Sequence, residues 1–166
     1  GAGGAGYFGC AWLFARRRIS TVATQKLTDQ AQATQIAQWM HPVLTDLLAL
    51  SLNLKQAHWH VRGRQFTQIH EQLDDVVDDA RRLADEVAER VVALGISVDG
   101  RPATVADKTA LPEFSEGFLI DDKIIAAVVE QLDAAIRRAR EAVGPLDDLD
   151  QVSQDVIIEV LRCLDK

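Results

Sequence analysis

The chain has 166 residues, enough for one domain of ordinary size and too few for two. Apolar residues make up 48% and charged residues 26%, a balance that supports a buried core and excludes a disordered chain. No run approaches the ~18 apolar residues of a membrane span. Two cysteines, Cys10 and Cys163, are too few for a disulfide framework or a cysteine metal site. The net charge of −7 argues against a generally basic nucleic-acid binder.

The charge is unevenly distributed along the chain. Residues 1–26 contain Arg16, Arg17, Arg18 and Lys26 and no acidic residue, so they carry +4 and leave −11 for residues 27–166. Their order, Gly-rich, then apolar, then basic, is the reverse of a secretory signal. We interpret residues 1–26 as a disordered basic extension or as sequence outside the natural reading frame, and residues 27–166 as the folded domain.

Apolar spacing predicts two long helices in the first part of this domain. Over residues 28–61, Leu44, Leu47, Leu54 and His58 share one face at the 3.6-residue period, and Pro42 is expected to begin or kink that helix. Residues 65–94 carry apolar side chains at steps of three and four over about 30 residues, or about 45 Å of helix.

The second half predicts three further helices. Residues 99–116 are rich in Gly, Pro and polar side chains, with one short helix expected over 103–108. A long helix is expected over 119–143, broken by Gly144 and Pro145, and another from Asp150 to the end of the chain. No strand pattern, phosphate-binding loop or nucleophile motif appears. The pattern predicts an all-α four-helix bundle with a short extra helix between helices two and three.

A stripe of potential metal ligands runs along helix 65–94. His70, Asp74, Asp85 and Glu89 fall within about 100° of arc, away from the apolar face of the same helix. Asp74 and Asp85 are nevertheless about 16 Å apart along the axis, so one straight helix cannot bring both pairs to one metal. If both pairs serve one centre, a second copy of the helix must run antiparallel across a twofold axis.

Spacing alone leaves a simpler alternative open. A charged stripe opposite a core face is usually solvent-facing, and this helix carries many other charges. His58 shares its face with leucines and, taken alone, is typical of a core histidine. Imidazole and carboxylate ligands suit iron, manganese or zinc without selecting one of them.

The stretch from Leu52 to Gly95 resembles the signature of the Dps family, the mini-ferritins or DNA-binding proteins of starved cells. The family shows K-x-x-H-W-N-v-x-G, F-x-x-x-H-E-x-x-D and D-x-x-A-E-R, and the similarity extends over about residues 28–166. The matching residues are Lys55, His58, Trp59, Gly63, Phe66, His70, Glu71, Asp74, Asp85, Ala88, Glu89 and Arg90. Two features depart from the family: His60 replaces an Asn, and the last helix lacks about two closing turns.

The resemblance implies a ferritin-like fold and a ferroxidase that oxidises Fe(II), preferably with hydrogen peroxide rather than oxygen, stores the ferric product and protects DNA. Each two-iron centre would take His58, His70 and Asp74 from one subunit and Asp85 and Glu89 from its mate, in a dodecamer. Trp59 would lie beside the centre with a packing role, and Glu71 and Arg90 would form structural ion pairs.

The resemblance also implies a cytoplasmic location, with nucleoid association as an extension of it. Acidic residues in the turn before the last helix and early in that helix would line iron-entry pores, or else cap the helix; these are Asp147, Asp148, Asp150 and Asp155. The alternative function is DNA compaction, in which the cage repeats a weak phosphate contact made by Arg16, Arg17, Arg18 and Lys26. A third possibility is a helical interaction module without metal.

Overall fold

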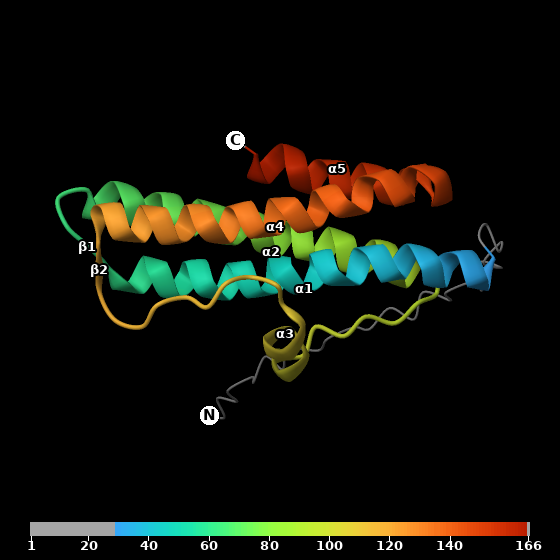
Figure 1. The fold of residues 1–166 in the computed structure, drawn as a ribbon, viewed down its shortest axis with the longest axis horizontal. Coiled ribbons are helices and arrows are strands. Elements are labelled where there is room, and N and C mark those ends of the chain that lie inside the picture. The colour runs from blue at the N-terminus through green and yellow to red at the C-terminus, as the bar shows by residue number, and fades with distance from the viewer. Residues whose placement is uncertain (1–28, 166) are drawn as a thin grey trace, which may run out of the picture.

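The computed structural model describes residues 29–165 and shows the predicted all-α four-helix bundle with a short additional helix (Figure 1). The elements in chain order are α1 (Gln30–His60), β1 (Val61–Arg62), α2 (Phe66–Ala93), α3 (Pro102–Lys108), β2 (Leu119–Ile120), α4 (Asp121–Leu149) and α5 (Gln151–Leu164). None of the described helices is long and apolar enough to cross a membrane.

Two helical hairpins form the bundle. α1 and α2 pack closely as an antiparallel pair, α4 and α5 form the second pair, and α1 also packs on α4 while α5 packs on α2 (Figure 1). The long connection between α2 and α4 returns along the bundle and carries α3 on the flank of α1. All four long helices contribute fully buried side chains to the core, namely Ile36, Met40, Leu47, Leu50, Leu54, Leu83, Ile124, Leu146 and Ile157.

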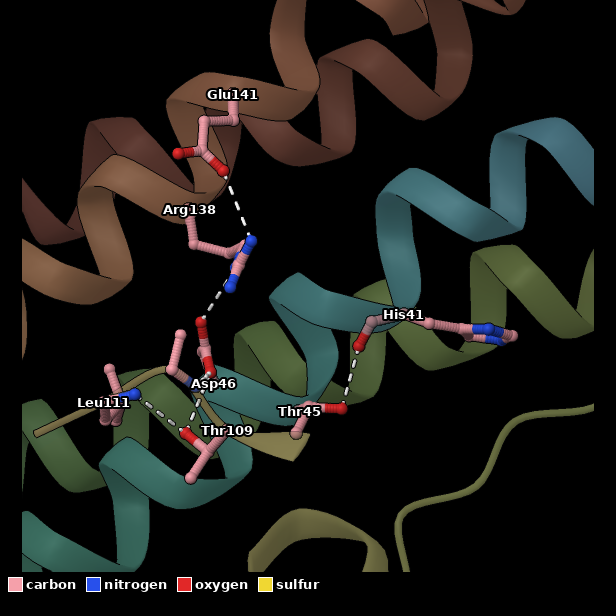
Figure 2. Close-up of polar contacts among 8 residues, drawn as sticks. His41, Thr45, Asp46, Thr109, Leu111, Arg138 and Glu141 are labelled. Carbon is pink, nitrogen blue, oxygen red and sulfur yellow. Dashed lines mark hydrogen bonds and ion pairs between the residues drawn. The ribbon is translucent and has the colours of Figure 1, made fainter. Parts of the chain in front are cut away.

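A buried carboxylate fastens the end of α3 to the bundle (Figure 2). Asp46 of α1, only 2% exposed, accepts hydrogen bonds from the Thr109 hydroxyl at 2.8 Å and the Ala110 N–H at 2.9 Å. Arg138 of α4 approaches the other oxygen at 3.3 Å and also reaches Glu141. Because three segments converge on one buried charge, this cluster fixes where α3 lies relative to α1 and α4.

The predicted helix boundaries are confirmed at most ends and wrong at Pro145. Of the two expectations for Pro42, that it begins the helix is wrong, because α1 runs through it, and a kink there stays a prediction. α4 also continues through Gly144 and Pro145 to Leu149, where we expected a break. Leu146 lies in this continuation and is fully buried in the core, so its burial favours the helical path of these last turns. Gly95, with φ +82°, follows the last residues of α2 as expected.

A short strand pairing that the sequence did not predict joins the ends of two connections. Val61 pairs with Leu119 and Arg62 with Ile120, in parallel. Two residues are too short for an alternating pattern to be recognisable. The pairing holds the corner between α1 and α2 against the start of α4.

The last helix covers only part of the bundle. α5 has 14 residues, against 28 in α2 and 29 in α4. Beyond its end, a largely apolar groove of about 340 Å³ lies between α2 and α4, lined by residues that include Ile69, Leu73, Val76, Ile125 and Val128.

Candidate metal centre

The corner between α1 and α2 brings two predicted ligands into direct contact. His58 lies in the last turn of α1, and His70 lies in the second turn of α2. Their rings stack with centroids 3.5 Å apart and planes inclined by 23°. Phe66 packs against the His70 ring with centroids 4.9 Å apart. The two histidines therefore form one unit at the end of the hairpin.

Reciprocal hydrogen bonds orient both rings. His58 Nδ1 lies 2.8 Å from the main-chain oxygen of His70, and His70 Nδ1 lies 2.9 Å from that of His58. A carbonyl oxygen only accepts, so each Nδ1 must carry the hydrogen. In a neutral imidazole the lone pair is then on Nε2, which is the atom available to a metal. His58 is buried, as its place on the apolar face of α1 predicts. Both rings nevertheless keep one nitrogen, Nε2, that could bind a metal.

Asp74 lies one turn after His70 on the same side of α2. Its Oδ1 is 3.3 Å from His58 Nδ1 and also pairs with the ammonium of Lys55 on α1. The hydrogen bond from Lys55 is the main cause that lowers the pKa of Asp74, and the positive charge of Lys55 lowers it further. The Asp74 side chain remains 45% exposed, so an ionised carboxylate faces solvent beside the two imidazoles.

The other predicted pair lies further along α2. Asp85 and Glu89 are both exposed, and 11 residues of helix, or about 16 Å, separate Asp85 from Asp74. Within residues 29–165, no group of three or more His, Cys, Asp or Glu side chains is arranged to hold a metal ion. In a single protomer His58, His70 and Asp74 therefore lie next to one another without a metal-binding arrangement, and Asp85 and Glu89 lie apart from them.

Three neighbouring residues of the motif have different surroundings. Trp59 is 61% exposed in the protomer, so packing within the chain does not occupy it. Arg90 forms the predicted structural ion pair, reaching Asp150 at 2.6 Å and Ser153 at 3.0 Å. Glu71 is exposed and forms no ion pair within residues 29–165, so its structural ion pair stays a prediction.

His60, which departs from the family motif, does not disturb the helix end. It is the last residue of α1, and its Nδ1 donates to the Gln56 carbonyl at 2.9 Å. This bond ties the His60 ring back onto the last turns of α1.

The acidic residues around α5 divide into two kinds. Asp150 is the N-cap of α5 and accepts from the Ser153 N–H and from Arg90. Burial opposes ionisation of Asp150, but the hydrogen bonds from Ser153 and Arg90 outweigh it and lower its pKa. Asp147, Asp148 and Asp155 are exposed. The structure thus assigns a capping role to one member, and the pore role of all four remains a prediction.

The sequence does not predict two contacts at this site. Lys55 belongs to the motif, but the motif does not show that it pairs with Asp74; its position three residues before His58 is the available signal. Asp121, at the start of α4, accepts hydrogen bonds from the backbone of the α1–α2 corner. No local pattern could reveal a contact between segments 57 residues apart. The basic residues Arg16, Arg17, Arg18 and Lys26 lie outside the described residues.

Comparison with known proteins first defines the class. The family model for the ferritin-like domain matches residues 40–166. The Dps structure from Microbacterium arborescens in the high iron form superposes with a TM-score of 0.80 and 44% identity, covering 83% of this chain and 90% of that chain. The chain is therefore a ferritin-like protein.

Curated relatives narrow the class to one family. The chain is 34% identical over 132 residues to the DNA protection during starvation protein of Mycolicibacterium smegmatis, covering 80% of this chain and 72% of the relative. It is also 34% identical over 148 residues to DNA protection during starvation protein 2 of Deinococcus radiodurans, where the match covers 89% of this chain and spans only 59% of the relative. The chain belongs to the Dps family.

Proposed function

We propose that this protein is a ferroxidase and iron-storage mini-ferritin whose two-iron centre is completed by a second copy of the chain. The observation that carries the proposal is the oriented histidine pair. Each Nδ1 of His58 and His70 is bonded to a backbone carbonyl, which leaves Nε2 as the nitrogen free to bind a metal, and the Asp74 carboxylate lies against the same pair, 3.3 Å from His58 Nδ1. This is half of a centre with nitrogen and oxygen donors, which suits iron among other metals.

The second half would come from Asp85 and Glu89 of a symmetry-related subunit. Both carboxylates are exposed on the same stripe of α2 and have no role in the core of their own protomer. An antiparallel twofold contact between two α2 helices would place each pair opposite the histidine half of the other chain. The proposed assembly is the family dodecamer, with α2 and α3 at the twofold contact.

Fe(II) is the substrate of this centre, and hydrogen peroxide is the proposed oxidant in preference to oxygen. Two Fe(II) ions supply two electrons, which together with two protons reduce one peroxide to two waters and leave two Fe(III) ions. Carboxylates of Asp74 and Glu89 favour the ferric product because its charge is higher. Paired electron delivery avoids release of hydroxyl radical, and this would protect DNA. The high iron form known for the Microbacterium relative supports iron as the metal.

One experiment tests the activity and the assembly together. Anaerobic protein is titrated with Fe(II), peroxide is then added, and the mass is measured by light scattering on the same sample. We expect saturation near two Fe(II) per centre, rapid oxidation by peroxide, and a twelve-subunit mass, all three as the family implies. A stable monomer, or oxidation no faster than that of free Fe(II), would contradict the proposal.

Pore residues and location belong to the same proposal. Exposed carboxylates at Asp147, Asp148 and Asp155 would attract Fe(II) if the assembly brings them around one axis. Asp150 would contribute its charge there only in addition to capping α5.

The proposed location is the cytoplasm, with nucleoid association if DNA is bound.

DNA compaction is the second candidate, favoured by the +4 charge of residues 1–26 against −11 elsewhere. The relatives named for DNA protection are consistent with it. A salt series of gel shifts, with and without residues 1–26, separates the two functions. Binding that needs those residues and falls steeply with salt would support a phosphate contact. Equal binding by a protein starting at Leu27 would exclude the basic segment as its cause.

A further inference from the structure

The corner between the two histidines is held from outside the hairpin. Residues 61–65 connect α1 to α2, and the segment just before α4 closes over them. The parallel pairing of Val61 with Leu119 is one contact. The Arg62 guanidinium lies over the Phe118 ring, 3.4 Å from its centroid, as a second.

The third contact is a carboxylate that caps α2 from a distant element. Asp121 Oδ2 accepts the N–H of Arg64 at 2.8 Å and of Gln65 at 3.3 Å. Gln65 is the N-cap of α2 and its own side chain makes no capping bond. A negative charge is favourable at this helix end, where N–H groups lack partners. Asp121 therefore supplies the cap that the local sequence does not.

Gly63 makes room for this carboxylate. Its φ is +137°, and a Cβ built there would lie 2.2 Å from Asp121 Oδ1 and 2.4 Å from Cγ. Asp121 Oδ1 is itself buried without a hydrogen-bond partner among the described residues. Burying an unpaired carboxylate oxygen is costly, so the contacts through Oδ2 must offset it for the carboxylate to remain in this place.

The histidine geometry depends on this same corner. The bonds from His58 Nδ1 to the His70 carbonyl and from His70 Nδ1 to the His58 carbonyl both span it. At 2.8 and 2.9 Å they are ordinary hydrogen bonds, and a shift of α2 by about 1 Å would break them. We propose that Asp121 is a positioning residue for the metal centre: by capping α2 across Gly63, it fixes the corner in which the Nδ1 bonds of His58 and His70 leave both Nε2 atoms for a metal.

This inference rests on the proposed metal centre, so its test includes a readout that needs no metal. The variants are Asp121→Ala, Asp121→Asn and Gly63→Ala, each made in the full chain and checked for helicity and mass. Ile157→Val, in the core on α5, is the control for a modest loss of stability away from the corner. The readouts are equilibrium binding of Co(II) with its visible spectrum, and the ring tautomers of metal-free protein by solid-state ¹⁵N NMR of labelled histidine.

We expect Asp121→Ala to weaken Co(II) binding by about tenfold to 100-fold, as for losses of groups that orient ligands. The Nδ1–H tautomers of His58 and His70 should be lost with it. Asp121→Asn should stay close to the wild type, because its amide oxygen accepts the same N–H bonds. Gly63→Ala should weaken Co(II) binding as much as Asp121→Ala does, because its Cβ displaces the Asp121 carboxylate. In the double variant, Gly63→Ala should therefore weaken binding little beyond the effect of Asp121→Ala.

Two outcomes overturn the inference. One is unchanged tautomers in Asp121→Ala, which would make Asp121 only a cap. The other is an equal weakening of Co(II) binding in the Ile157→Val control. If the wild type binds no Co(II), the proposed metal centre fails, and the tautomers alone then decide the role of Asp121.

Discussion

Mixing two inactive variants gives the sharpest test of a centre shared between subunits. Asp74→Ala and Glu89→Ala should each lose fast peroxide-driven Fe(II) oxidation. Neither side chain is part of the core: Asp74 is 45% exposed and Glu89 lies on the exposed stripe of α2. Truncating either one therefore removes a proposed ligand without opening a cavity.

The expected recovery follows from the symmetry. In a mixed dimer, one centre receives both defects and the other combines an intact histidine half with an intact Asp85 and Glu89 half. Random pairing of equal amounts makes half of all dimers mixed, and half of their centres are intact. Activity should thus return to about a quarter of the wild type.

The assay is the initial rate of Fe(II) oxidation by peroxide after co-expression of differently tagged subunits and two-step purification. Asp75→Ala, at an exposed neighbouring position on α2, is the matched control and should keep full activity. Verified mixing with no recovery would show that the two pairs do not meet across a subunit boundary. Activity in Asp74→Ala alone would show that Asp74 is not a ligand.

Three further perturbations are predicted. Lys55→Met should tighten Co(II) binding in an equilibrium titration, because the ammonium that pairs with Asp74 is a competing cation; weaker binding would contradict this. Asp46→Ala should lower stability by about 2–3 kcal/mol, because buried donors from Thr109 and Ala110 lose their acceptor, whereas exposed Glu141→Ala should cost about 0.5 kcal/mol or less in the same thermal scans. For Asp150, whose folded-state pKa is lowered, the ionised form stabilises the fold above the ordinary pKa range, and this contribution is lost as pH falls through the lowered value. The difference in melting temperature between wild type and Asp150→Asn should therefore be largest near neutral pH and shrink below about pH 4; a constant difference would refute it.

Local periodicity explains why the helices were predictable. The apolar residues of α2 repeat at steps of three and four, and Ile69, Leu73, Leu83 and Val87 are all buried as the pattern requires. Pro145 does not predict where α4 ends. The hydrogen bond that proline removes from a helix is a local loss, whereas the stabilisation from burying Leu146 depends on the rest of the bundle. Contacts such as that of Asp121 with the backbone of Arg64 join segments far apart in sequence, and no single stretch records them.

In the candidate site, too, the sequence predicts which residues share a helix face but not what that face contacts. A charged stripe on α2 looks identical whether it faces water or a second subunit, because exposure in one protomer is the same in both cases. The orientation of the histidines bears on this choice. His58 is buried, and His58 and His70 each direct Nδ1 at the carbonyl of the other across the corner, which leaves both Nε2 lone pairs for a ligand. His60 also directs Nδ1 at a carbonyl, that of Gln56, and has no place in the proposed centre, so the recovery of activity in mixed subunits decides between the two readings.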